Sequence, residues 1–287
     1  MTLIWSDLEP SRVGLGCSRF GSMTQPMTQG QAHALVGAAL DAGVNLFDTA
    51  NIYGQGDSER WLGAALKGKP AFVCSKAGQV LPTRSASLRL IKTLLGPMVR
   101  SVASLQRKVL DRRSAPYPVC FEPEHLRTEA QASLRRLGRD RIDGFFLHNP
   151  DIEVLARGDA VEALDDLRQQ GDIGLLGLST DEAPAAFAAM ADPRIRLLQL
   201  PLELLRRAPE VGVAAKQAGV GIVVREIFGG FAPGGARVNK DTADAIIAET
   251  VGIEGVTTAL VGTCKVAHLL QAARAADRAT SSKVCAA

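Results

Sequence analysis

The sequence lacks the features that mark disulfide-rich, metal-binding and membrane proteins. Its five cysteines are scattered and form no CxxC pair, which argues against a disulfide framework or a zinc site and favours a reducing cytoplasm. No apolar run approaches the ~20 residues that a membrane-spanning helix needs. The first ten residues contain no basic stretch followed by an apolar core, so we expect no secretory signal. These absences predict a cytoplasmic protein without a metal site or a membrane segment.

The chain also has little net charge. Its 33 lysines and arginines exceed its 30 acids by three, which is too small an excess to predict binding to nucleic acid or to an anionic membrane. With 46% hydrophobic and 22% charged residues, the composition is ordinary for a soluble protein. A globule of 287 residues buries roughly three quarters of its unfolded surface, which is enough for one large core. We expect one domain over residues 1–287 that acts on a small molecule; the sequence indicates no oligomeric state.

What the chain does have is a regular alternation of short apolar runs and longer segments with helical spacing. The predicted strands cover residues 12–15, 45–47, 71–74, 142–147, 173–178, 196–200, 221–224 and 258–261. The predicted helices cover residues 29–42, 124–137, 160–170, 183–190, 209–218, 241–251 and 266–276. Eight β-then-α units predict an α/β fold in which a parallel sheet closes on itself, a (β/α)8 or TIM barrel.

An open, doubly wound sheet is the alternative fold. Sheets of that kind that bind dinucleotides carry a GxGxxG turn after the first strand. Here Gly14-Leu15-Gly16 lacks the third glycine and leads into no obvious helix. The barrel is therefore favoured.

Two segments depart from the alternation. Residues 81–123 are predicted to form an insertion over the barrel mouth, because residues 83–113 hold eight Lys/Arg and one acid beside apolar residues at rough helical spacing. A solvated basic face is one interpretation of the segment 84–113, and a substrate lid with anion-binding groups or a membrane-surface helix are the others. The last residues, 277–287, are small and polar and are expected to form a flexible tail.

Most of the predicted strands end in polar residues. In an α/β barrel the chemistry takes place at the carboxyl ends of the strands, which closure brings onto one rim. The polar or glycine residues at these ends are Asp48, Lys76, His148, Ser179, Thr180, Gln199, Arg225, Gly262 and Thr263. Tyr53 follows Asp48 by five residues, in a loop with Gly54 and Gly56.

Four of these residues suit the reduction of a carbonyl by hydride, which leaves an alkoxide that must be protonated. A free tyrosine, with a pKa of about 10, holds its proton too tightly to exchange it readily near neutrality. Lys76 beside Tyr53 is expected to lower that pKa, and Asp48 to hold Lys76 charged and in place. A neutral His148 could orient the carbonyl oxygen. Singly, each residue has an ordinary interpretation as a turn or loop side chain; their order at successive strand ends favours a site.

At these residues the chain resembles the aldo-keto reductase family. Residues 45–54 (NLFDTANIYG) and 58–66 (SERWLGAAL) resemble the family's signature around its catalytic Asp and Tyr. Similar segments surround Lys76 and His148, and the resemblance covers nearly the whole chain. It implies a (β/α)8 barrel, a catalytic tetrad of Asp48, Tyr53, Lys76 and His148 with Tyr53 as proton donor, and NADPH/NADP+ as cofactor, with NADH as an alternative.

The resemblance also implies which residues bind the cofactor. Ser179, Thr180 and Gln199 match positions that hold the nicotinamide amide, although an asparagine is more usual than Thr180. Arg225 lies in the seventh-strand loop over the pyrophosphate, where the neighbouring carboxylate of Glu226 is unfavourable unless it points away.

The segment from Gly262 to His268 matches the loop and helix start at the 2′-phosphate end, where helix amides suit a phosphate. Its implied binding residues are Gly262, Thr263, Lys265 and His268. His268 stands where an arginine is common, and Gln271 and Ala272 stand where Glu-Asn is common. Lys265 offers the 2′-phosphate a positive charge in place of that arginine, but only as a point charge, without the bidentate fork of a guanidinium.

These features predict an NADP(H)-dependent oxidoreductase that reversibly reduces an aldehyde or ketone. The altered residues at the adenosine end motivate an alternative, a catalytically weak family member with a binding or regulatory role. A further alternative is an unrelated lyase or aldolase that forms a Schiff base at Lys76. The identity of the substrate depends on loop side chains that the sequence does not position.

Overall fold

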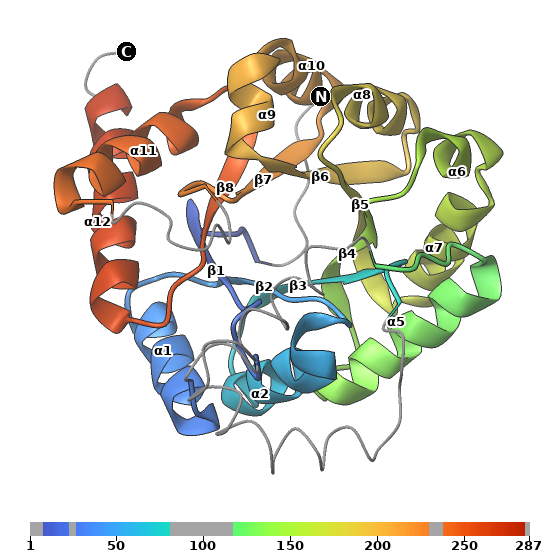
Figure 1. The fold of residues 1–287 in the computed structure, drawn as a ribbon, viewed down its shortest axis with the longest axis horizontal. Helices are drawn as coiled ribbons and strands as arrows, with labels where there is room; N and C mark the ends of the chain where they lie inside the picture. Colours follow the sequence, from blue (N-terminus) through green and yellow to red (C-terminus); the bar gives the residue numbers. More distant parts are fainter. Residues whose placement is uncertain (1–7, 23–26, 81–116, 230–237, 285–287) are drawn as a thin grey trace, which may run out of the picture.

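In the computed structural model, which describes residues 8–22, 27–80, 117–229 and 238–284, eight parallel strands close into one barrel (Figure 1). The strands are β1 (Val13–Gly16), β2 (Leu46–Asp48), β3 (Phe72–Ala77), β4 (Ile142–His148), β5 (Ile173–Ser179), β6 (Ile195–Pro201), β7 (Gly221–Arg225) and β8 (Val256–Val261). Each strand pairs with the next in sequence, and β1 pairs with β8 in the register Val13 to Ala259, which closes the barrel. The predicted (β/α)8 barrel is confirmed.

Helices form an outer ring around the strands (Figure 1). They are α1 (Gln29–Asp41), α2 (Asp57–Leu66), α5 (Pro123–Leu137), α6 (Ile152–Arg157), α7 (Asp159–Gln170), α8 (Ala183–Ala191), α9 (Leu202–Arg207), α10 (Glu210–Ala218), α11 (Lys240–Gly252) and α12 (Val266–Val284), with a 3-10 turn η1 (Tyr53–Gly56). The seven predicted helices are all present. The elements α2, α6, α9 and η1 were not among the predicted helices. None of the helices in the described ranges is long and apolar enough to cross a bilayer.

The carboxyl-terminal segment differs from the expectation of a flexible tail beginning at residue 277. The helix α12 instead continues to Val284. Its extension is supported by Ala275 and Ala276, which are buried, and by an ion pair of 2.8 Å between Arg278 and Asp244 of α11. Alanine and arginine are strong helix formers, and tertiary contacts on one face add to that propensity. Residues 285–287 lie outside the described part of the chain.

The predicted insertion over the barrel mouth falls largely outside the described residues, since 81–116 are not described. Its two ends lie together. Gln79 forms an antiparallel bridge with Val119, and the amide of Cys120 donates to the carbonyl of Gly78 at 2.7 Å. The chain therefore leaves and rejoins the barrel at one place, next to the end of β3.

The barrel interior is packed with side chains from the strands. This interior cluster consists of Leu46, Phe72, Cys74, Phe146, Leu197, Val223 and Leu260. The alternate residues of the same strands, such as Phe47, Val73 and Phe145, belong to a larger cluster shared with the surrounding helices. Two concentric apolar layers thus hold the strands, and the inner one forms a solid floor beneath the carboxyl ends.

Candidate active site at the carboxyl ends of the strands

The polar side chains predicted at the strand ends form a layer above the interior cluster. Successive residues of a strand point to opposite faces, so residues two apart share a face. Leu46, Cys74, Phe146, Leu197 and Val223 of the interior cluster are followed two residues later by Asp48, Lys76, His148, Gln199 and Arg225. The alternation that fills the barrel therefore also directs these five polar groups toward its axis.

Lys76 is fully buried and makes three hydrogen bonds through its ammonium group. Its Nζ donates to Asp48 Oδ1 at 2.7 Å, to Asp48 Oδ2 at 2.8 Å and to the carbonyl of Thr49 at 2.8 Å. Burial by itself would lower the pKa of Lys76, but the Asp48 carboxylate and its hydrogen bonds raise the pKa above the ordinary value. The lysine is therefore held charged and in one position, as the sequence analysis expected.

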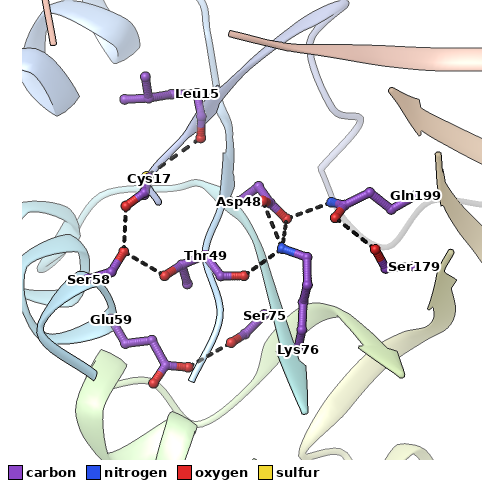
Figure 2. A network of polar contacts seen from close by, with 10 residues as sticks. All are labelled: Leu15, Cys17, Asp48, Thr49, Ser58, Glu59, Ser75, Lys76, Ser179 and Gln199. Atoms are coloured by element: carbon purple, nitrogen blue, oxygen red, sulfur yellow. Dashed lines mark hydrogen bonds and ion pairs between the residues drawn. The ribbon is translucent and has the colours of Figure 1, made fainter. Parts of the chain in front are cut away.

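The carbonyl of Thr49 is itself held by a buried network (Figure 2). The Thr49 amide donates to the carbonyl of Cys74 at 2.9 Å, and its hydroxyl lies 2.7 Å from Ser58 Oγ. Ser58 Oγ in turn donates to the carbonyl of Cys17 at 2.8 Å. Neighbouring strands and α2 thus position the third acceptor of Lys76.

A separate contact fixes the lysine strand to the helices behind it (Figure 2). Ser75 Oγ donates to Glu59 Oε1 at 2.6 Å, and Arg136 of α5 pairs with the other carboxylate oxygen. Glu59 and Ser75 are both fully buried. Because Ser75 precedes Lys76 on β3 and faces the opposite way, this contact restrains the backbone that carries the lysine.

Tyr53 lies in η1 close to Lys76, with the lysine Nζ 5.1 Å from the centre of its ring. The tight turn after it depends on Gly54, which has φ of 57° and on which a Cβ would lie 2.5 Å from the carbonyl oxygen of Phe20. Desolvation raises the pKa of Tyr53, and this effect outweighs the lowering by Lys76, so the pKa lies above its ordinary value. The lowering by Lys76 that was expected is thus present, but burial of the phenol outweighs it.

His148 faces Tyr53 edge-on, with ring centres 6.3 Å apart and an interplanar angle of 89°. Desolvation, then the charges of Lys76 and Arg225, lower the pKa of His148 well below its ordinary value, so the imidazole is neutral near pH 7, as expected. Its Nδ1 is buried without a hydrogen-bond partner among the described residues. An imidazole N–H would be poorly placed there, which favours the proton on Nε2.

Gln199 joins the catalytic layer directly. Its Nε2 donates to Asp48 Oδ1 at 2.7 Å, and its Oε1 accepts from Ser179 Oγ at 3.3 Å (Figure 2). Thr180 is buried beside them, and its hydroxyl accepts from the amide of Glu182 at 3.1 Å. The Asp48 carboxylate therefore connects Lys76 to Gln199 and Ser179, which the family resemblance associates with nicotinamide.

A cavity of about 300 Å³ opens over this layer. Six predicted site residues line it: Asp48, Tyr53, His148, Gln199, Arg225 and Gly262. Its walls also include residues that the sequence analysis did not predict, namely Ser18, Arg19, Gln79, Tyr117, Ile227 and Phe228. Ser18 and Arg19 follow β1, so applying the strand-end rule to the first strand would have found them. No comparable signal marks Tyr117.

The predicted residues at the adenosine end lie apart from this cavity. Lys265 and His268 are exposed, around the first turn of α12, and neither lines it. Thr263 Oγ1 accepts from the Lys265 amide at 3.0 Å, which orders the turn before the helix. Gln271 donates to Asp244 of α11 at 2.6 Å. Cofactor residues implied by the resemblance therefore form two groups, one inside the cavity and one on the surface beyond it.

Glu226 lies on the wall of the cavity, where its carboxylate is neutralised by a neighbour. Its backbone has φ of 57°, an uncommon conformation for a residue with a side chain, and its carboxylate pairs with Arg225. The Glu226 side chain is 50% exposed. Its charge is therefore both paired and in contact with water.

A larger cavity of about 460 Å³ lies at the opposite, amino-terminal end of the barrel. It is lined by Arg12, Lys216 and the segment 251–255, together with Ala279 and Thr280 of α12. The Arg12 guanidinium donates there to the carbonyls of Val256 at 2.7 Å and Thr257 at 2.9 Å. These contacts join strands and helices, and none of the predicted site residues lies in this cavity.

Comparisons with known proteins agree with this geometry. A family model, the aldo/keto reductase family, matches residues 12–250. The chain is 31% identical to a D-threo-aldose 1-dehydrogenase from a Pseudomonas species over 225 residues, which cover 75% of this chain and 65% of that relative. It is 29% identical to an NADH-specific methylglyoxal reductase from Escherichia coli over 252 residues, which cover 82% and 72%. The chain thus spans a little under two thirds of the first relative's length.

Solved structures share the fold. A Pseudomonas aeruginosa protein described as an aldo-keto reductase superposes with a TM-score of 0.73 at 25% identity, covering 96% of this chain and 92% of that one. An aldo-keto reductase from Klebsiella pneumoniae in complex with NADPH superposes with a TM-score of 0.63 at 20% identity, covering 93% and 86%. With the family model extending over most of the barrel, the chain belongs to the aldo/keto reductase family.

Proposed function

We propose that this protein is an NADP(H)-dependent oxidoreductase that reversibly reduces an aldehyde or ketone, with Tyr53 as the proton donor. The observation that carries the proposal is the buried Lys76–Asp48 pair, with Nζ 2.7 Å from Oδ1, beneath a cavity that Tyr53 and His148 line together. A carbonyl oxygen bound between Tyr53 and His148 would meet two neutral donors above a fixed cation. That arrangement stabilises the charge that develops on the oxygen during reduction.

Each residue of the tetrad has a distinct role in this proposal. The reduced nicotinamide supplies the hydride when bound. Tyr53 gives its proton to the substrate oxygen in reduction and takes it back in oxidation. His148 donates a hydrogen bond from Nε2 to the same oxygen, and Lys76 stabilises the tyrosinate that remains. Asp48 holds the lysine.

The residues present fit a nicotinamide cofactor. Gln199 offers its amide to the cavity and is held by Ser179 Oγ, and a Cβ on Gly262, which also lines the cavity, would meet no atom within 4 Å. Beyond the cavity, Thr263, Lys265 and His268 would hold the adenosine end, while Thr180 would lie at the nicotinamide end and Arg225, on the cavity wall, near the pyrophosphate. The Klebsiella structure contains NADPH, whereas the Escherichia coli relative is NADH-specific. His268 supplies less charge than the arginine that is common at its position, so we propose NADPH binding with appreciable NADH binding.

The chemistry of Lys76 argues against the Schiff-base alternative. A nucleophilic lysine must be deprotonated, and burial in an apolar pocket usually achieves this. The pKa of Lys76 is instead raised, and all three of its N–H bonds are directed at acceptors. The substrate is proposed to be a small carbonyl compound, not a nucleic acid or a membrane lipid, and the scattered cysteines support a cytoplasmic location.

Calorimetric titration with NADPH and with NADH, followed by turnover assays, tests the proposal. We expect micromolar or tighter binding of NADPH, and we expect Tyr53→Phe to lower kcat at least about 1,000-fold with cofactor affinity retained. Tyr117→Phe is the matched variant, because it also removes a tyrosine hydroxyl from the cavity wall. It should alter KM more than kcat. Full turnover by Tyr53→Phe would contradict the assignment. Undetectable binding of both cofactors would favour the catalytically weak, regulatory alternative.

A further inference from the structure

Arg225 is, with Arg19, one of two arginines on the wall of the catalytic cavity, in addition to the buried Lys76. It lies at the carboxyl end of β7 and lines the cavity together with Tyr53 and His148. In a closed barrel of eight strands, β7 is four strands away from β3, which carries Lys76. The two cations therefore originate from strands on opposite sides of the barrel, and the Arg225 guanidinium reaches across to Thr180 and Asp181 after β5.

The Arg225 side chain is held on three sides. Its Nη2 donates to Asp181 Oδ1 at 2.5 Å and to the carbonyl of Thr180 at 3.5 Å, and its Nη1 pairs with Glu226. The left-handed backbone at Glu226, with φ of 57°, brings that carboxylate back onto the arginine. Unfavourable backbone conformations of this kind persist where the surrounding structure requires them, and they cluster at functional sites.

The two cations are neutralised to different degrees. Lys76 is fully buried against Asp48, whose side chain is 7% exposed, so their charges largely cancel within the low-dielectric interior. Asp181 and Glu226 are 55% and 50% exposed, whereas the Arg225 side chain is 19% exposed. Water screens the two carboxylates more than the guanidinium, and the arginine's field persists inside the cavity.

The directions of the pKa shifts of Tyr53 and His148 agree with that geometry. The charge of Arg225 lowers the pKa of both Tyr53 and His148, although burial contributes more to each pKa, and Tyr53 in turn raises the pKa of Arg225. The charged and titratable groups around Tyr53 include Asp48, Lys76, His148 and Arg225. Arg19 and Glu226 also lie on the cavity wall.

We propose that Arg225 serves as an electrostatic partner of Lys76, stabilising the negative charge that forms on the Tyr53 oxygen when the proton leaves. This role is separate from any contact with the cofactor, and it rests on the proposed function only for its effect on the reaction. In reduction, Tyr53 loses its proton to the substrate oxygen and becomes a tyrosinate between two cations. In oxidation, the same charge makes the tyrosinate available as the base.

The test uses the cofactor-free protein, so that its outcome does not depend on turnover. The chain has only two tyrosines, Tyr53 and Tyr117, and four histidines. In a Tyr117→Phe background the ultraviolet absorbance of tyrosinate, read after a pH jump and before alkaline unfolding, reports Tyr53 alone. Histidine NMR reports His148 in the same protein.

Arg225→Gln is expected to raise the pKa of Tyr53 and also that of His148, because a cation disfavours the protonated form of each group. A purely structural effect that lets water into the cavity would move the two in opposite directions. Hydration would relieve the burial that raises the pKa of Tyr53 and lowers that of His148, so the tyrosine pKa would fall while the histidine pKa rose. The sign of the Tyr53 change therefore separates an electrostatic role from a packing role.

Two further variants complete the design. Arg225→Lys keeps the positive charge but loses the forked guanidinium. It should shift the pKa values of Tyr53 and His148 less than Arg225→Gln does. Arg206→Gln removes an exposed arginine of α9 that pairs with Glu249, and it should change neither of these two pKa values. In turnover assays Arg225→Gln should lower kcat for reduction by about tenfold, the equivalent of one pKa unit. An unchanged or lowered Tyr53 pKa in Arg225→Gln would overturn the proposal, whether or not the protein turns over substrate.

Discussion

Two arginines at opposite ends of the barrel, Arg12 and Arg225, occupy different electrostatic environments. Arg12 donates to backbone carbonyls, among them those of Val251 and Val256, and burial lowers its pKa despite the charge of Glu9. Burial also lowers the pKa of Arg225, but the carboxylates of Asp181 and Glu226 raise it above the ordinary value. Neutral carbonyls hold a guanidinium in place, whereas carboxylates also stabilise its charge. The same residue type therefore serves packing at one end and electrostatics at the other.

The cavities beside these arginines make the same point. The amino-terminal cavity, of about 460 Å³, is larger than the catalytic one, of about 300 Å³. Only the smaller cavity has the carboxyl ends of the strands beneath it, where the side chains of several strands converge. Convergence of titratable groups, rather than volume, locates the chemistry in this fold.

The largest expected difference in turnover comes from substituting one lysine at each end of the barrel. Lys76→Met should lower kcat/KM at least about 1,000-fold, because it removes the cation beside Tyr53. Lys216→Met makes the same substitution at the amino-terminal cavity, on a lysine that is 65% exposed, and should leave turnover unchanged. Steady-state kinetics of both variants test this. Comparable losses in both would mean that the substitution acts through general destabilisation.

Arg12→Gln should produce the complementary result, a loss of stability with turnover retained. The substitution leaves the carbonyls of Val251, Val256 and Thr257 without their guanidinium donor, and we expect it to lower the free energy of unfolding by about 2 to 4 kcal/mol. Denaturant unfolding measures the change. Arg206→Gln, whose ion pair with Glu249 is exposed, should cost less than about 1 kcal/mol. A large drop in kcat for Arg12→Gln would show that the two ends are coupled.

A smaller effect is expected from pH, to which the catalytic end contributes through His148. The pKa of His148 in the folded protein lies well below the ordinary value of 6.5. The unfolded chain therefore binds a proton that the folded chain does not, once the pH falls below about 6.5. The sign follows: the unfolding free energy decreases with falling pH, by at most about 1.4 kcal/mol per pH unit, until the folded pKa is reached.

Denaturant unfolding of the wild type and of His148→Gln across this pH range isolates the contribution. The variant should lack the part of the slope that His148 supplies. The control is His268→Gln at the exposed start of α12, which should keep the wild-type slope. Equal slopes in His148→Gln and in the wild type would contradict the assignment of a buried, neutral imidazole.

Much of the fold and the catalytic layer could be predicted from the sequence, because both depend on the same period of two. Apolar residues such as Cys74 and Phe146 fill the interior, and the next inward positions are Lys76 and His148. Once eight strands are counted and closed, the strand-end positions have to meet. Strand and helix ends were accordingly predicted closely for most elements, and the Asp48–Lys76 contact followed from the topology.

Other features required distances and burial. The sequence indicates that Lys76 lies near Tyr53 and lowers its pKa, but not how deeply Tyr53 is buried, and it is this burial that raises the pKa overall. The part of the cavity wall formed by Tyr117 comes from a loop without a period. The extension of α12 to Val284 depends on contacts with α11, such as that of Arg278, which no local pattern reveals.

The sequence by itself determined the order of strands and helices, the closed barrel that follows from it, and the identities of the polar residues at its carboxyl rim. These are properties of periodicity along the chain. Only the tertiary structure decided that Lys76 is fully buried, that Gln199 shares the Asp48 carboxylate, and that Arg225 lines the same cavity as Tyr53. The physical reason is that charge and desolvation act through space, and their balance depends on neighbours that lie far apart in the sequence.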